Sequence, residues 1–190
     1  MSVSDIIHSR RSNRAFDSSR AVPKEALEKI VNAALLAPSA MNQQPWRIYV
    51  SMNDEFLRKV GLLVEEVTAK SYPGILSRKE ALGVKEAIFY DAPAVLFITK
   101  RKDLPAPVCA DIDIGLCLEN AILAVYELGL TCVPVALPAM FGKDIINDHL
   151  KIDTDKEEFM ITLPIGYARP DYEGPTQKAL QEGTVVWLDE

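Results

Sequence analysis

One long apolar segment, residues 107–128, constrains the fold of this chain more than any other feature. Its spacing predicts a helix with almost no polar face, closed by Gly129 as a C-cap. A helix that is apolar all round must be buried on every side. Because a chain of 190 residues has little core to surround it, we expect part of this helix to face a second subunit. Its apolar members are Ile112, Ile114, Leu116, Leu118, Ala121, Ile122, Leu123, Ala124 and Val125.

Composition limits the class of protein. With 48% apolar and 25% charged residues, the chain predicts one globular domain over residues 1–190, large enough to bury roughly 70% of its unfolded surface. A net charge of -6 argues against partners such as nucleic acid or an anionic membrane. No stretch reaches the ~20 apolar residues that span a bilayer. The three cysteines form no C-x-x-C pair, so we expect core residues in a reducing compartment, the cytoplasm.

Periodicity and turn residues predict the remaining elements. We expect helices over residues 3–12, 23–37, 53–69 and 143–150, and strands over residues 46–50, 94–99, 131–136 and 159–167. Pro164 predicts an edge position or a bulge for the last strand. Residues 70–90 are interpreted as a mobile lid with a short helix on the substrate side. The apolar residues 185–188 are expected to pair with a sheet edge, of this or of another subunit.

Several familiar sites are excluded by spacing. The closest pair of glycines is eight residues apart, so the chain has neither G-x-G-x-x-G nor a Walker A loop, and a phosphate would need side-chain cations and helix termini. His8 and His149, the only histidines, are interpreted as helix-surface residues. Asp111 and Asp113 do not face the same way on a helix. We therefore expect no metal site.

Two segments carry candidate chemistry. Arg10-Arg11-Ser12-Asn13-Arg14 places three of the nine arginines within five residues, which predicts either a bound anion or a solvated helix end. The loop Ala37–Trp46 combines one hydroxyl, three amides and two prolines. Such an array of donors and acceptors suits a heteroaromatic or ribityl ligand, and a tight connection between helix and strand is the alternative.

Together these segments resemble the FMN-dependent nitroreductase family. The resemblance covers nearly the whole chain in the expected order, and the first two motifs are its most specific part. It implies an α+β fold, a three-layer α/β/α arrangement with a mostly antiparallel central sheet, in an intertwined homodimer with two FMN sites at the interface. The matching residues are Arg10-Arg11-Ser12-x-Arg14 with Phe16, Ala37-Pro38-Ser39-x-x-Asn42-x-Gln44-Pro45-Trp46, Asp113, Asn120, Leu128-Gly129-Leu130-Thr131 with Pro134, Pro164-Ile165-Gly166-Tyr167 and Trp187.

The resemblance also implies roles for single residues. Arg10 would meet the FMN phosphate, with Lys178 as a second cation and Arg169 as a weaker candidate. Arg11 and Ser12 would contact the phosphate and ribityl side, and Arg14 the pyrimidine edge, where its charge stabilises reduced flavin.

Two further segments receive roles in the same way. Pro38, Ser39, Ala40 and Asn42 would come from the other subunit. The backbone of Pro134, Val135 and Ala136 would lie near flavin N5, with an N–H of Val135 or Ala136 as donor. Many relatives carry an acidic residue and a glycine where this chain has Ala136 and Leu137, and no side chain is expected to act as nucleophile.

The function implied is an FMN-dependent oxidoreductase. It would transfer hydride from NADH or NADPH through flavin N5 to a small-molecule acceptor, such as a nitroaromatic or a quinone, in a ping-pong cycle. One alternative is a specialised flavoenzyme of the same fold: an enone reductase, a reductive dehalogenase or a flavin-processing enzyme. Another is a flavin-binding dimer without enzymatic activity.

Overall fold

A four-stranded antiparallel sheet with strand order β1-β2-β4-β3 forms the middle of the molecule. The computed structural model describes residues 2–176 and 179–188. β2 and β4 are the long central pair, and β3 contributes only two residues. The strands are β1 (Trp46–Ser51), β2 (Ala94–Arg101), β3 (Thr131–Cys132) and β4 (Glu157–Gly166).

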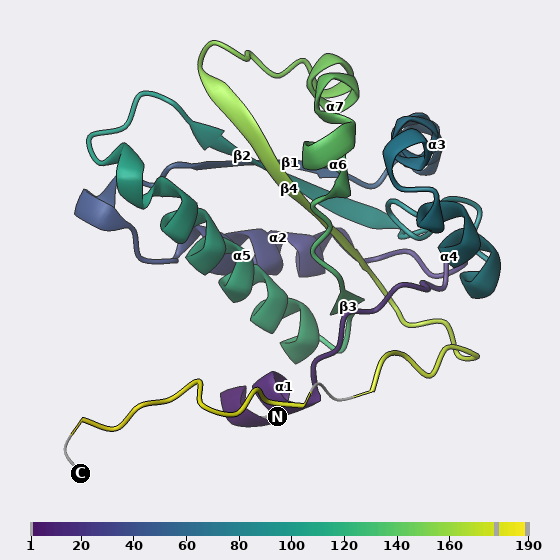
Figure 1. Cartoon of the computed structure of the whole chain (residues 1–190), viewed down its shortest axis with the longest axis horizontal. Coiled ribbons are helices and arrows are strands. Elements are labelled where there is room, and N and C mark those ends of the chain that lie inside the picture. The colour runs from purple at the N-terminus through teal and green to yellow at the C-terminus, as the bar shows by residue number, and fades with distance from the viewer. Residues whose placement is uncertain (1, 177–178, 189–190) are drawn as a thin grey trace.

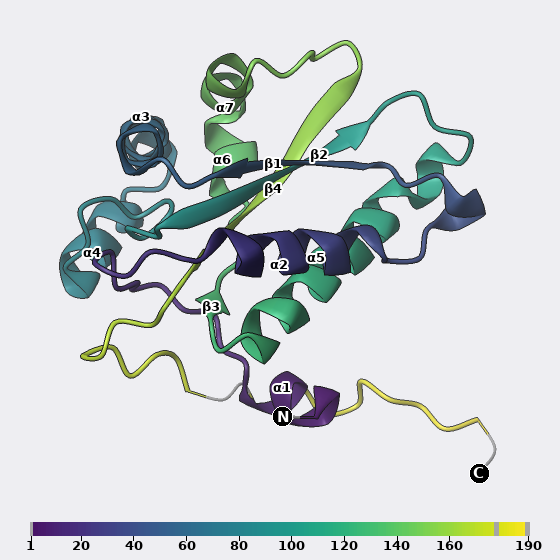
Figure 2. The same cartoon turned by 180° about the vertical axis from the view of Figure 1, so that it is seen from behind.

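Helices cover both faces of this sheet (Figures 1 and 2). One face carries α2 (Lys24–Leu35) and α5 (Ala110–Glu127), and the other carries α3 (Asp54–Ser71), α4 (Gly74–Leu82), α6 (Leu137–Phe141) and α7 (Lys143–Leu150). The short α1 (Val3–Ser9) packs against α5. The predicted α+β fold with three α/β/α layers is confirmed. Within the described ranges, no helix is long and apolar enough to cross a bilayer.

The central strand β2 supplies both hydrophobic cores. Ala94, Leu96 and Ile98 point into the cluster under α2 and α5, whereas Val95 and Phe97 point into the cluster under α3 and α7. Each of these side chains is fully buried. Alternate side chains of a strand face opposite sides of a sheet, so a continuous apolar run is what a strand covered on both faces requires.

The predicted lid at residues 70–90 is wrong over its second half. Ile88, Phe89 and Tyr90 are at most 1% exposed and fill the core beneath α3. The buried Glu86 carboxylate accepts the backbone N–H groups of Ile88 at 2.7 Å and Phe89 at 2.8 Å, and that of Asp91 at 3.2 Å. Residues 84–91 are therefore a packed loop wound around a carboxylate.

Pro164 lies in an interior strand, so the predicted edge position is wrong. Its carbonyl accepts the N–H of Val133, and the N and O of one residue point to the same side of an antiparallel strand. The missing N–H of Pro164 therefore faces β3, which has already ended at Cys132. The bulge occurs elsewhere, where the register shifts between Ile98 and Thr99.

Two apolar segments that were expected to be covered are exposed in the single chain. On α5, Ile112 is 67% and Leu116 41% exposed, although the opposite face of the helix is buried. The apolar residues 185–188 are exposed and belong to no strand. Burial of α5 on every side is thus not achieved within one chain, and the pairing of residues 185–188 stays a prediction.

Candidate functional site

The arginine segment is an extended stretch of chain that begins where α1 ends. The predicted helix stops at Ser9 because Arg10 adopts an extended conformation, with φ -58° and ψ 140°. Asn13 then fixes the segment beside β3: its N–H donates to the carbonyl of Cys132 at 3.1 Å, and its side-chain amide to Oγ1 of Thr131 at 2.8 Å. This anchoring makes Arg10–Arg14 a defined strip at the edge of the sheet.

The end of α5 holds the same segment from a second side. The hydroxyl of Tyr126 accepts the N–H of Arg11 at 3.2 Å and donates to the Arg11 carbonyl. Burial is the main reason that the pKa of Tyr126 is raised. The Arg11 guanidinium donates to the carbonyls of His8 and Arg10 at 2.8 and 2.7 Å, which closes the last turn of α1.

Arg10, Arg11, Ser12 and Arg14 of this segment line a cavity of about 570 Å³. Among the residues that the structure describes, no carboxylate forms an ion pair with any of its three arginines. Arginines that line one cavity without an acidic partner favour an anion, and phosphate suits the planar donor geometry of a guanidinium group. The donor set therefore fits the phosphate side of FMN. The lining comprises Ile7, His8, Arg10, Arg11, Ser12, Arg14, Pro175, Thr176 and Leu180.

Arg169 and Lys178 are the two other cations that are predicted to bind the phosphate. Arg169 donates to the carboxylate of Asp171 at 2.6 Å and to the carbonyl of Leu82 at 2.8 Å, so its guanidinium is held at the end of α4 and not in the cavity. Lys178 lies outside the described residues.

The second predicted segment, the loop before β1, has a strained backbone. Met41, Asn42 and Gln44 adopt positive φ angles of 52°, 52° and 45°. Ser39 Oγ accepts the N–H of Gln44 at 3.0 Å, and the Gln44 side chain donates to Asn42 Oδ1 at 3.0 Å. Non-glycine residues in such conformations each cost of order 1–3 kcal/mol and cluster at ligand sites, because surrounding contacts must hold them.

The contacts that hold this loop involve two residues, Gln43 and Asp113, for which the sequence predicts no role at the site. Gln43 is buried, and its side-chain amide donates to Oδ2 of Asp113 at 2.7 Å and to the carbonyl of Ala106 at 3.1 Å. The other oxygen of Asp113 accepts the N–H of Ala40 at 3.1 Å. The sequence does contain a signal for Asp113, because it is a carboxylate within the most apolar helix of the chain. A buried carboxylate needs hydrogen-bond partners, whereas an ordinary acid at a helix N-terminus stays exposed.

The third segment, Pro134–Ala136, follows β3 directly. The N–H of Val135 donates to the carbonyl of Thr162 in β4 at 2.9 Å. The prediction that this N–H donates to flavin N5 is therefore wrong, because it is already hydrogen-bonded to the sheet. Ala136 is exposed at the start of α6, and its N–H has no acceptor in the described part of the chain. Ala136 is thus the available donor of this segment.

The segments gather at opposite ends of α5 (Figure 1). The arginine strip and Pro134–Ala136 lie by its C-terminal end, through Tyr126 and β3, and the strained loop lies by its N-terminal end, through Asp113. Asp113 and Tyr126 are thirteen residues apart on this helix, which corresponds to about 20 Å. One chain therefore does not bring the two predicted motifs to a common point.

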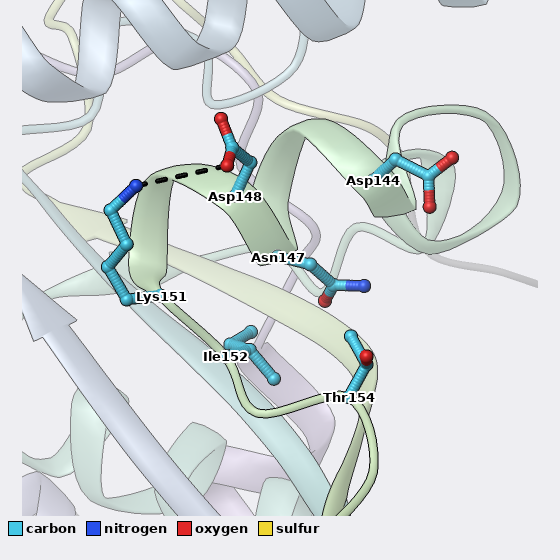
Figure 3. A pocket seen from close by; sticks show the side chains of 6 residues that line it. All are labelled: Asp144, Asn147, Asp148, Lys151, Ile152 and Thr154. Carbon is cyan, nitrogen blue, oxygen red and sulfur yellow. Dashed lines mark ion pairs between the residues drawn. The ribbon is translucent and has the colours of Figure 1, made fainter.

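A second hollow has no comparable charge. It lies at α7, measures about 460 Å³, and is lined by two carboxylates and one lysine, with Asp144 apart from the pair Asp148 and Lys151 (Figure 3). Asp148 and Lys151 neutralise each other at 3.8 Å. Within residues 2–176 and 179–188, no three metal-ligating side chains come together. The arginine cavity is therefore the candidate site. The second hollow is lined by Asp144, Asn147, Asp148, Lys151, Ile152 and Thr154.

Comparison with known proteins places these features in a family. The profile of the nitroreductase family matches residues 7–167. A protein of Methanothermobacter thermautotrophicus named NADH dehydrogenase/NAD(P)H nitroreductase is 31% identical over 134 residues, 70% of this chain and 60% of that protein. This chain thus spans about three fifths of that relative's length.

Two further relatives cover more of the chain. The iodotyrosine deiodinase of Thermotoga neapolitana is 27% identical over 86% of this chain and 87% of its own length. A nitroreductase with bound FMN from Bacteroides fragilis superimposes with a TM-score of 0.82 at 22% identity over 100% of both chains. That superposition shows a common fold.

Proposed function

This chain belongs to the nitroreductase family, and from that premise we propose that it is an FMN-dependent oxidoreductase that passes hydride from NADH or NADPH to a small organic acceptor, such as a nitroaromatic or a quinone. The observation that carries the proposal is the cavity of about 570 Å³ whose arginines have no acidic partner in the described chain. The family member named NAD(P)H nitroreductase supports the choice of electron donor.

The residues at the cavity have distinct proposed roles. Arg10, Arg11 and Ser12 bind the phosphate and ribityl side of FMN, and Lys178 adds a second cation. The positive charge of Arg14 sits at the pyrimidine edge and favours the negative charge that this edge gains on reduction. The N–H of Ala136 is offered to the ring near N5. FMN, when bound, supplies the electron sink that this chain's own side chains lack.

The other half of each site is proposed to come from a second copy of the chain. Pro38, Ser39, Ala40 and Asn42 lie about 20 Å along α5 from the arginine cavity. The exposed apolar stripe of α5, which consists of Ile112 and Leu116, lies on the same helix near its loop end. A two-fold axis that crosses α5 midway between Asp113 and Tyr126 would place one chain's cavity beside the partner's loop and turn the stripe toward the partner. The chain's three cysteines are free, which fits the reducing compartment we propose, the cytoplasm.

FMN binding and nicotinamide oxidation test the proposal together. We expect protein that is mixed with FMN and then separated from unbound FMN to keep a flavin spectrum, and its melting temperature to rise. NADH or NADPH should bleach that spectrum in anaerobic stopped-flow runs. A colourless protein with an unchanged melting temperature contradicts the proposal. Stable FMN binding with no nicotinamide oxidation above the background of free flavin would identify a flavin-binding dimer without activity.

Reductive dehalogenation is a second candidate function. A deiodinase relative matches 86% of this chain, more than the 70% matched by the archaeal nitroreductase relative. Anaerobically reduced protein should be mixed in parallel with a nitroaromatic, a quinone and 3-iodo-L-tyrosine. Faster reoxidation by the nitroaromatic or the quinone supports the main proposal, and faster reoxidation with release of iodide supports the dehalogenase.

A further inference from the structure

Asp113 is a buried carboxylate without a cation. It is 3% exposed and forms no ion pair within the described chain. Its two oxygens instead accept the N–H of Ala40 at 3.1 Å and the side-chain amide of Gln43 at 2.7 Å. A buried charge is costly unless its hydrogen bonds compensate it, and bonds to a charged acceptor are stronger than neutral ones. Both donors belong to the strained loop.

The two donors lie on either side of Met41 and Asn42, two of the strained residues. Ala40 precedes Met41 and Asn42, and Gln43 lies between Asn42 and Gln44, the three residues with positive φ. Asp113 therefore binds the backbone N–H of Ala40 before this turn and the side-chain amide of Gln43 after it. Gln43 adds a second clamp through Ala106, whose N–H donates to Gln43 Oε1 at 3.1 Å and whose carbonyl accepts from Gln43 Nε2 at 3.1 Å.

The position of Asp113 on α5 connects this clamp to the dimer face. It is the neighbour of Ile112, which is 67% exposed on the apolar stripe, whereas Asp113 itself is buried. One rigid helix thus carries both the surface expected to meet the second copy and the carboxylate that fixes the loop presented to that copy's cavity.

We propose that Asp113 is a positioning residue for cofactor binding: it holds Ser39, Ala40 and Asn42 in the one conformation that contacts FMN, without touching FMN itself. This inference rests on the proposed function. When the carboxylate is lost, the loop relaxes toward unstrained angles and its contacts with FMN are lost, while the core around α5 stays packed.

The test compares Asp113→Asn with Asp111→Asn. Both variants remove one negative charge from the first turn of α5, but Asp111 is exposed and pairs with Lys100 at 2.6 Å. FMN affinity is measured by fluorescence titration, and the melting temperature is measured without FMN. We expect Asp113→Asn to weaken FMN binding roughly tenfold or more, the scale of one charge-assisted hydrogen bond, and Asp111→Asn to change it less than about twofold.

A structural role alone predicts a different result. It would lower the melting temperature of Asp113→Asn without FMN and leave its FMN affinity equal to that of Asp111→Asn, which overturns the proposal. Hydrogen exchange at the Ala40 amide provides a readout independent of FMN, and we expect faster exchange in Asp113→Asn. If the wild-type chain binds no FMN, the proposed function fails, and exchange at Ala40 still decides whether Asp113 holds the loop.

A second variant covers the case in which Asp113→Asn does not fold. Gln43→Leu removes one of the two bonds and leaves the carboxylate bonded to Ala40. We expect weaker FMN binding in Gln43→Leu as well. Where both single variants fold, the double variant should bind FMN no more weakly than the single variant with the lower affinity. The reason is that the effects of substituting two residues in contact are not additive when the residues act together. Fully additive losses, or unchanged affinity in Gln43→Leu, would contradict the proposal.

Discussion

Arg10 brings a positive charge to a cavity whose described lining contains no carboxylate. We expect Arg10→Ala to weaken FMN binding by roughly 1.5–3 kcal/mol, the scale of a hydrogen bond to a charged group. Arg20→Ala is the matched control, because the exposed Arg20 stacks over the Tyr167 ring at 3.6 Å, outside the cavity lining. Titration of each variant with FMN measures the effect. Equal affinity in the two variants would remove Arg10 from the phosphate site.

Arg14 is expected to act on redox behaviour more than on binding. A fixed positive charge stabilises the reduced, more negative form of a bound cofactor, so Arg14→Ala should lower the midpoint potential while FMN affinity changes less than in Arg10→Ala. A dye-coupled redox titration measures this potential. Arg14→Lys keeps the charge and should stay closer to wild type. A potential that is the same in all three proteins speaks against the assignment.

At the scale of elements, the loop after α4 makes stability depend on pH. Burial raises the pKa of Glu86 from its ordinary value near 4.5 to about 7. Between these two values the folded chain retains a proton that the unfolded chain releases. The contribution of Glu86 to the free energy of unfolding is therefore greatest below pH 4.5 and declines as the pH rises to about 7. The decline amounts to roughly 3 kcal/mol.

Paired variants isolate this contribution. Urea unfolding at pH 5 and pH 8 should show a larger loss of unfolding free energy for wild type than for Glu86→Gln, which carries no titrating proton. Glu80→Gln removes an exposed carboxylate from the neighbouring α4 and should lose as much as wild type. The same pH dependence in Glu86→Gln and wild type would show that Glu86 stays ionised in the folded protein.

Elements defined by local patterns were predicted well from the sequence. The bounds of α7 match residues 143–150, β2 has the expected two-sided burial, and the side chain of Asn53 caps α3 by accepting the N–H of Phe56 at 3.0 Å. The arginine strip was located for the same reason, since its charge density is visible in five consecutive residues.

Features that depend on distant partners were missed. Residues 84–90 are predicted as a lid because nothing local shows that Ile88, Phe89 and Tyr90 pack in the core beneath α3. Pro164 is predicted as an edge residue because its own neighbours in the sequence do not show that the adjacent strand β3 ends at Cys132. Asp113 received no role because its donors lie about seventy residues away. In each case tertiary contact, not local propensity, determines the structure.

At the scale of the whole molecule, the apolar stripe of α5 provides a test of assembly. Leu116 and Leu62 are 41% and 43% exposed, the first on the stripe and the second on α3. Leu116→Glu should convert the proposed dimer to monomers and lower FMN affinity, because a buried unpaired charge disfavours an interface. Leu62→Glu should leave both unchanged. Light scattering measures the mass, and a wild-type protein that is monomeric at high concentration would contradict the proposed assembly.

In the proposed dimer, the separation of the half-sites along α5 has a genetic consequence. A homodimer of Arg10→Ala and a homodimer of Asp113→Asn are each damaged at both cofactor sites. A mixed dimer of the two places both lesions in one site and leaves the other site wild type. Co-expression of the two variants should therefore restore up to half of the high-affinity flavin sites per mixed dimer, and a pair with lesions at the same end of α5 should not complement.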